Sequence, residues 1–335
     1  MTSHTHHFFP WQKSTAQRWL SDRQRFSHAW LIHGQPGIGK QQFALAAAGS
    51  LLCQTPDHGL ACGQCSACRW VSSGNHPDLR YVCPDAMSAA ESASNSKEIR
   101  IEQLRGLNDW LHTTTHAGGW RVVVIYPAET LNPVSANALL KVLEEPPANT
   151  VFMLVGTAID QLLPTIVSRC RRLPLPLPDK QQAIDWLAEQ GVQQAQAWLA
   201  AASGGPLTAY QLAQQQDQPY PAWLLALVTE LDQSRHRSVA VASIASEIEK
   251  LDAADWIMTL QRLFMDFNLL KHGQQARYYP DLPGLQSVAS RSSISRLAQM
   301  SKWLLAQQRV ANHPLNAQLR CHQVLNKAVR ACLSN

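Results

Sequence analysis

A glycine-rich turn between an apolar run and a helical segment constrains the fold of this chain more than any other feature. Residues 30–33 form the apolar run, and residues 34–41 follow it with the spacing G-x-x-x-x-G-K. Glycines let the backbone approach phosphate oxygens, and Lys40 would neutralise the terminal phosphates of a nucleotide. The spacing therefore predicts a P-loop in an α/β domain, with a glycine-rich turn that binds no ligand as the alternative. The three glycines are Gly34, Gly37 and Gly39.

The position after Lys40 separates nucleotide binding from hydrolysis. A P-loop normally carries Ser or Thr there, and this chain carries Gln41. A carboxamide cannot replace the hydroxyl that completes the octahedral shell of Mg²⁺. We therefore expect that ATP and Mg²⁺ can still bind here but that phosphoryl transfer is impaired.

A second buried strand, at residues 121–127, lacks the acids that ATP hydrolysis requires. Its β-branched residues are bounded by glycines and a proline, and we expect it to be parallel to the P-loop strand and to lie beside it. In P-loop ATPases such a strand ends in an acid that orders Mg²⁺, and a second acid can orient the attacking water. Tyr126 and Pro127 occupy those positions, and neither can hold a metal or accept a proton from water at neutral pH. Glu129 is nearby but out of register.

Three blocks further along the chain carry a family resemblance. They are residues 135–147 (S-A-N-A-L-L-K-V-L-E-E-P-P), the strand-like residues 151–155, and residues 168–170 (S-R-C). Together they resemble the bacterial clamp-loader AAA+ family, most closely its delta-prime members, over essentially the whole chain. The first block is highly specific to clamp loaders. The resemblance implies an α/β P-loop AAA+ domain with an inserted zinc knuckle, a small helical lid domain and an all-α C-terminal collar domain.

Within that family the S-R-C motif implies an arginine finger, so Arg169 would reach into the ATP site of a neighbouring subunit. A guanidinium suits this role because it is always charged and binds phosphate oxygens through two parallel hydrogen bonds. The alternative is a structural arginine that pairs with a carboxylate at a strand end. Cys170 is expected to be a small buried residue, since no His or Asn partner pattern accompanies it.

Three more parts of the chain bear on nucleotide chemistry. Trp11 and Gln12 resemble the family's adenine-side entry segment, and Thr157 could act as a polar sensor or simply end its strand. Residues 202–208 resemble the lid-domain turn in which active relatives place a phosphate-sensing arginine, and Leu207 occupies that position. The chain thus departs from an active ATPase at four positions, which predicts a subunit that does not hydrolyse ATP. These positions are Gln41, Tyr126, Pro127 and Leu207.

Four cysteines with the spacing C-x₈-C-x₂-C-x₂-C predict a structural zinc site. They are Cys53, Cys62, Cys65 and Cys68. Four thiolates without an accompanying carboxylate or open position suit a closed tetrahedral site. Disulfides and an iron–sulfur cluster are the alternatives. No apolar signal segment is present at the N-terminus, so we expect a cytoplasmic protein with reduced cysteines.

The 335 residues are enough for two or three domains, and 45% of them are hydrophobic. Alternating prolines end the first domain, which we place at residues 1–176 with the cysteine module at 53–68. A lid domain is expected at residues 177–216 and a collar of five or six helices at residues 217–335. No apolar run approaches transmembrane length, and the net charge of +5 is dispersed.

The residues and the resemblance favour a non-hydrolysing clamp-loader subunit over two alternatives. Its implied partners are the clamp-loader ATPase subunits, the clamp-opening subunit, the sliding clamp and primer–template DNA, with no membrane. An active AAA+ motor would instead hydrolyse ATP as an isolated chain. A zinc-dependent nucleic-acid module is disfavoured because only Arg69 and Trp70 give the cysteine loop a basic and aromatic surround. Any polymerase activity belongs to the assembled holoenzyme.

Overall fold

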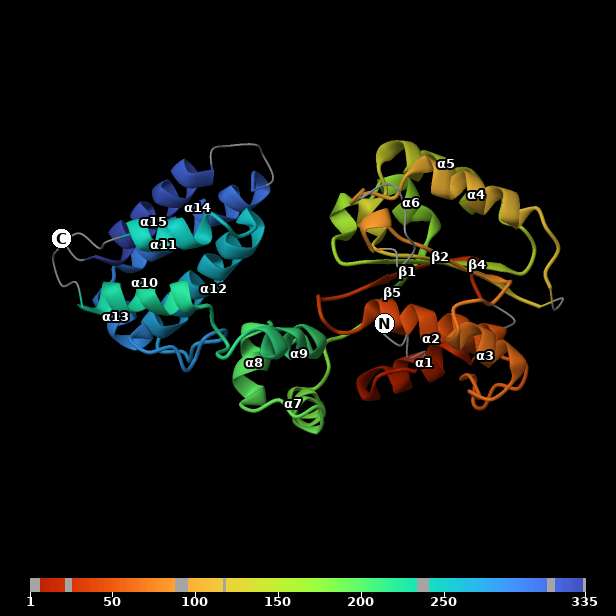
Figure 1. Cartoon of the computed structure of the whole chain (residues 1–335), viewed down its shortest axis with the longest axis horizontal. Coiled ribbons are helices and arrows are strands. Elements are labelled where there is room, and N and C mark those ends of the chain that lie inside the picture. The colour runs from red at the N-terminus through yellow and green to blue at the C-terminus, as the bar shows by residue number, and fades with distance from the viewer. Residues whose placement is uncertain are drawn as a thin grey trace. The chain divides into compact units, whose positions relative to one another are not determined.

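A parallel sheet of five strands, in the order β2-β3-β4-β1-β5, organises the N-terminal part of the chain (Figure 1). The chain divides into two units, residues 1–182 and 183–335. The computed structural model describes residues 7–21, 26–87, 96–116, 119–233, 241–311 and 317–333. The strands are β1 (Ala29–His33), β2 (Leu79–Val82), β3 (Arg121–Ile125), β4 (Thr150–Gly156) and β5 (Arg171–Pro174).

Helices cover both faces of this sheet, so its central strands are buried on two sides. Alternate residues of β3 enter different cores: Val122 and Val124 pack with α1 and α2, whereas Val123 and Ile125 pack with α4, α5 and α6. This explains why β3 and β4 read as continuous apolar runs. The helices are α1 (Lys13–Leu20), α2 (Lys40–Leu52), α3 (Ser66–Ser72), α4 (Ile101–Leu111), α5 (Pro133–Glu144) and α6 (Pro164–Arg169). Short 3₁₀ turns are η1 (Pro10–Gln12), η3 (Asp85–Met87), η4 (Ala128–Thr130) and η5 (Ile159–Gln161).

The strand order corrects one prediction. We expected β3 to lie beside the P-loop strand β1, but β4 lies between them. Phe152 of β4 is opposite Ala29 of β1 on one side and opposite Val123 of β3 on the other. Apolar periodicity identifies a buried strand but not its neighbours, because those depend on where each crossover returns the chain. The carboxyl end of β4 consequently lies next to the P-loop.

The second unit is helical and contains two separate apolar cores. The smaller core is formed by α7 (Lys180–Glu189), α8 (Ala195–Ala201) and α9 (Pro206–Gln215). The six helices after them share the larger core. These are α10 (Ala222–Gln233), α11 (Ala242–Ile248), α12 (Ala253–Lys271), α13 (Leu285–Arg291), α14 (Ile294–Arg309) and α15 (Ala317–Cys332). The separation into lid and collar domains stays a prediction. Within the described ranges, no helix is both long enough and apolar enough to cross a membrane.

Candidate functional site

The P-loop has the strand–loop–helix arrangement that its spacing predicts. The loop follows β1, and α2 begins at Lys40. Gly37 and Gly39 have positive φ angles of 73° and 82°, a conformation that side chains other than glycine rarely adopt. A Cβ on Gly39 would also lie 2.8 Å from the Phe9 ring. At the start of the loop, a Cβ on Gly34 would lie 2.5 Å from the Leu175 carbonyl oxygen.

The segment before α1 is bound to this loop. The buried Gln12 side chain donates through Nε2 to the carbonyl oxygens of Ile38 (2.9 Å) and Gly39 (2.8 Å). Trp11 donates through Nε1 to the same Ile38 oxygen at 3.0 Å. These two residues were predicted to lie at the adenine side of the site, and the structure places them against the loop backbone. They hold the loop in its glycine-dependent conformation.

The two residues that begin α2 are engaged within the protein. Lys40 is buried, and its Nζ donates to the Gln35 carbonyl oxygen at 2.7 Å. Burial lowers the pKa of Lys40, and the negative charge of Glu129 opposes part of that shift. Gln41, which replaces the metal-binding hydroxyl, donates through Nε2 to the Tyr81 hydroxyl of β2 at 2.8 Å. Its amide therefore serves as a link between α2 and the sheet.

The two positions directly after β3 supply no acid for hydrolysis. Tyr126 and Pro127 follow Ile125, the last residue of the strand. Burial raises the pKa of Tyr126, with a smaller contribution from the charge of Glu129. The phenol is therefore neutral at physiological pH and cannot coordinate Mg²⁺ as a phenolate.

Sequence reasoning set Glu129 aside as out of register, but the structure gives this acid a defined place beside β4. Its Oε1 accepts a hydrogen bond from the Thr157 backbone N–H at 3.1 Å. Its Oε2 is buried without a hydrogen-bond partner in the part of the chain that the structure describes. This oxygen lies so close to the Gly156 Cα that any side chain there would collide with it. Thr157, the predicted sensor, is exposed and contributes its backbone N–H to this contact.

Arg169 ends α6 and forms an ion pair with Glu144, which ends α5. It also donates to the Thr165 carbonyl oxygen at 3.0 Å. The structural alternative predicted a carboxylate partner at a strand end; Arg169 does pair with a carboxylate, but both residues end helices. Both side chains are open to solvent, with 34% and 50% of their surface exposed. Exposed pairs of this kind contribute about 1 kcal/mol or less, so a stronger anion could displace Glu144. Cys170 is buried, as predicted, and burial raises its pKa to about 11.

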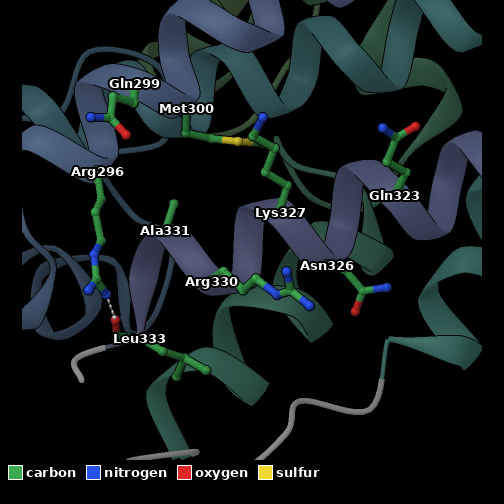
Figure 2. A pocket seen from close by; sticks show the side chains of 9 residues that line it. All are labelled: Arg296, Gln299, Met300, Gln323, Asn326, Lys327, Arg330, Ala331 and Leu333. Carbon is green, nitrogen blue, oxygen red and sulfur yellow. Dashed lines mark hydrogen bonds between the residues drawn. The ribbon is translucent and has the colours of Figure 1, made fainter.

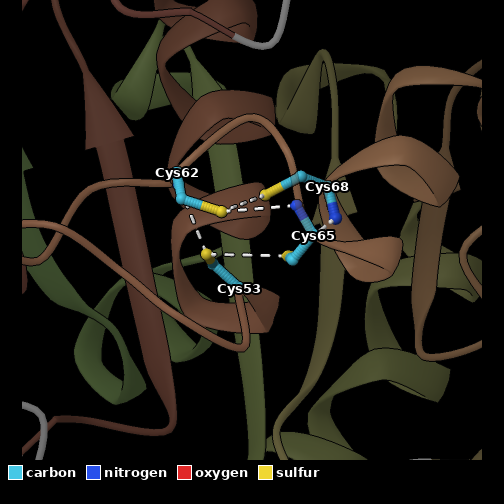
Figure 3. A group of neighbouring side chains, drawn as sticks. All are labelled: Cys53, Cys62, Cys65 and Cys68. Carbon is cyan, nitrogen blue, oxygen red and sulfur yellow. Dashed lines mark hydrogen bonds between the residues drawn. The ribbon is translucent and has the colours of Figure 1, made fainter.

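The four predicted cysteines come together between α2 and α3 (Figure 3). Their sulfur atoms all lie within 4.8 Å of one another, with Cys53–Cys65 and Cys62–Cys68 separations of 3.9 and 4.0 Å. Four sulfurs bound to one zinc ion at about 2.3 Å would lie about 3.8 Å apart. A disulfide needs about 2.05 Å between sulfurs, and all four cysteines are free. The cluster thus fits a tetrahedral metal ion.

Hydrogen bonds to the Cys62 sulfur favour its metal-binding thiolate form, whereas burial raises the pKa of Cys53 and Cys68. The Thr55 hydroxyl donates to the Cys62 sulfur at 3.3 Å, and the Cys65 backbone N–H donates to it at 3.4 Å. The Thr55 contact is the largest of several that lower the pKa of Cys62. The backbone N–H of Cys62 donates in turn to the Cys53 sulfur at 3.3 Å. Such contacts orient ligands and stabilise their charge in metal sites.

A cavity of about 790 Å³ in the second unit has no predicted site residue in its lining (Figure 2). Side chains of α14 and α15 line it. Its lining includes the cations Arg296, Lys327 and Arg330 and no carboxylate. Lys327 Nζ lies 4.2 Å from the centre of the Trp303 ring. The cavity therefore favours anionic over cationic groups.

Comparison with known proteins identifies relatives over most of the chain. A family model described as DNA polymerase III, delta subunit, matches residues 12–179. The DNA polymerase III subunit delta-prime of Pseudomonas aeruginosa is 33% identical over 316 residues, which cover 91% of this chain and 92% of that protein. The Escherichia coli K12 protein of the same name is 32% identical over 297 residues, covering 87% and 85%. A solved gamma subunit-related protein of Thermotoga maritima has 17% identity and a TM-score of 0.48, covering 96% and 99%.

Proposed function

The chain belongs to the family of DNA polymerase III delta-prime subunits, which are clamp-loader components, and we propose that it assists ATP turnover without hydrolysing ATP. In this proposal it donates Arg169 as an arginine finger to the ATP site of a neighbouring subunit. Its partners are the clamp-loader ATPase subunits, the clamp-opening subunit, the sliding clamp and primer–template DNA. The complex loads the clamp onto primed DNA in the cytoplasm.

One observation carries the proposal that the chain is inactive by itself. Where β3 ends, an active P-loop ATPase needs carboxylates, and this chain has Tyr126 and Pro127. Gln41 reinforces the inference because its amide is bound to Tyr81 instead of offering a hydroxyl to Mg²⁺. The side chains that this chain lacks are the ones that bind the metal ion and orient the attacking water in an active ATPase.

The surface position of Arg169 supports a role outside its own chain. Its guanidinium is partly exposed, and its Glu144 partner is half exposed, so the pair can separate at a small cost. A terminal phosphate of a neighbouring subunit's ATP carries more charge than one carboxylate and suits the planar guanidinium. Glu144 would pair with the guanidinium only until that phosphate replaces it.

The cysteine cluster is proposed to hold one structural zinc ion. Cys53, Cys62, Cys65 and Cys68 would supply all four ligands, leaving no position for water or substrate. Zinc would cross-link the end of α2 to the start of α3, since Cys53 follows α2 and Cys65 is the N-cap of α3.

ATP hydrolysis by the purified chain tests this proposal against an active motor. We expect no turnover above that of a Lys40→Ala variant, which loses the phosphate-binding charge and reports any contaminating ATPase. Turnover by the wild-type chain that Lys40→Ala abolishes would favour the active motor.

A further inference from the structure

The Glu129 carboxylate lies at the end of β4, beside the P-loop. The backbone there provides a hydrogen-bond donor and the space that the carboxylate occupies. The Thr157 N–H donates to one Glu129 oxygen at 3.1 Å, and Gly156 makes room for the other. Gly156 does not have a positive φ angle, so its backbone conformation does not require glycine. Its missing Cβ is needed because the Glu129 carboxylate takes that space.

This carboxylate shares the electrostatic environment of the P-loop lysine. The negative charge of Glu129 acts on Lys40 from the end of β4, which lies beside the end of β1, where His33 is opposite Gly156. The Lys40 Nζ itself is bound to the Gln35 carbonyl oxygen at 2.7 Å. A P-loop lysine normally meets the terminal phosphates of a nucleotide. Here that cation already has a loop carbonyl and a nearby internal anion as neighbours.

The second oxygen of Glu129 indicates that an additional phosphate beside Lys40 is disfavoured. It is buried and has no hydrogen-bond partner within the described ranges, so the Thr157 N–H on the other oxygen is the single donor that offsets desolvation of this carboxylate there. A phosphate arriving at Lys40 would add further negative charge close to it. Two like charges a few ångströms apart in a partly buried site repel strongly enough to change affinity by an order of magnitude or more.

We propose that Glu129 stands in for the terminal phosphate at this P-loop and thereby selects against nucleoside triphosphates. A diphosphate, which lacks the terminal group, is disfavoured less. The inference rests on the proposed function in treating the loop as a former ATPase site. It adds that this chain is kept free of ATP by one of its own side chains.

Equilibrium binding of fluorescent ATP and ADP analogues to the full zinc-loaded chain tests the proposal. The wild type should bind the ADP analogue more tightly than the ATP analogue. Glu129→Gln, which keeps the side-chain size and removes the charge, should tighten ATP binding roughly ten- to a hundredfold and ADP binding much less. Asp160→Asn removes an exposed acid of η5 and should leave both affinities unchanged.

A second variant displaces the carboxylate without replacing it. Gly156→Ala places a Cβ where Glu129 Oε2 lies, and the flexible glutamate is the group that must move. This variant should shift ATP affinity in the same direction as Glu129→Gln, with circular dichroism confirming that both variants fold.

Three outcomes would overturn the inference. Equal gains for the ATP and ADP analogues would show that Glu129 does not meet the terminal phosphate. Unchanged ATP binding in folded Glu129→Gln would show that the Glu129 charge does not disfavour ATP. Weaker ATP binding in this variant would indicate that Glu129 is a ligand of the nucleotide's metal ion. Hydrolysis of ATP by either variant or the wild type would instead contradict the proposed function, which binding does not measure.

Discussion

At the scale of single residues, this P-loop keeps the groups that shape a phosphate site and lacks the groups that act on Mg²⁺ and water. Gly37 and Gly39 retain their positive φ angles, and Lys40 retains its place at the start of α2. Gln41 and Tyr126, however, occupy positions where a hydroxyl and a carboxylate would be needed. Loop geometry and catalytic chemistry depend on different side chains, so one can persist without the other.

Gln12 is predicted to stabilise the loop that it contacts. Gln12→Ala removes two buried hydrogen bonds to loop carbonyl oxygens, so the free energy of unfolding should fall by about 1–3 kcal/mol in urea denaturation. Gln17→Ala, an exposed glutamine on α1, is the matched control and should have little effect. Equal losses for the two variants would contradict the assigned role of Gln12.

Asp266 of α12 is predicted to anchor the chain that follows this helix. Its carboxylate is fully buried and accepts hydrogen bonds from the backbone N–H groups of Arg277, Tyr278 and Tyr279. Asp266→Ala leaves these donors unpaired and should cost roughly 2–4 kcal/mol of unfolding free energy, measured by chemical denaturation. Asp266→Asn keeps one acceptor oxygen and should cost less. Equal costs would show that the acceptors are not what matters.

The same carboxylate gives stability a defined pH dependence. Burial raises the pKa of Asp266 above its ordinary 3.8, even though three N–H groups favour its charged form. The folded state therefore keeps this proton to a higher pH than the unfolded state does. Wild-type stability relative to Asp266→Asn should be greatest below about pH 4 and should decline as pH rises through the raised pKa. A difference that grows with pH would contradict this sign.

At the scale of elements, the cysteine loop acts as a joint between α2 and α3. Cys65 is both a predicted ligand and the N-cap of α3, where its sulfur accepts from the Cys68 backbone N–H. Gly63 has a φ angle of 75°, which lets the chain turn between Cys62 and Cys65. Helix capping and metal binding therefore depend on the same few residues.

Zinc removal is predicted to destabilise the connection between α2 and α3. Elemental analysis should find one zinc per chain, and Cys65→Ser should lose it. Chelation or Cys65→Ser should lower the melting temperature by roughly 5–15 °C, since a lost cross-link typically costs 2–4 kcal/mol. Cys83→Ser alters a buried cysteine outside the cluster and should retain zinc. A wild-type chain free of zinc would contradict the assignment.

Sequence reasoning succeeded for the elements with local signals. The C-x₂-C spacing predicted that the cysteine sulfurs cluster, and the β-branched run predicted β3. Both predictions depend on residues that are close in sequence. Sequence reasoning failed for the strand order and for Glu129, which depend on distant parts of the chain. The Glu129 carboxylate can occupy its position only because the end of β4 lies beside it and Gly156 has no Cβ. The sequence shows Glu129 shortly after the proline that follows β3, but only the fold shows that its carboxylate contacts the Thr157 N–H.

At the scale of the whole molecule, each of the two units has two apolar cores of its own, and the proposed contribution to ATP turnover comes from the surface of the first. Arg169 is weakly held by Glu144 in the isolated chain. Glu144→Gln should release the guanidinium without removing it, so turnover by the assembled clamp loader should stay close to the wild-type level. A large loss in Glu144→Gln would indicate that the pair is needed to position Arg169.

The most direct test of the central claim is ATP turnover by the reconstituted clamp loader with DNA and sliding clamp, comparing wild type with Arg169→Ala. Turnover at the site that Arg169 serves should fall on the order of a thousandfold. Arg169→Lys should rescue it poorly, because an ammonium lacks the planar pair of donors. Wild-type turnover in the Arg169→Ala complex would contradict the account.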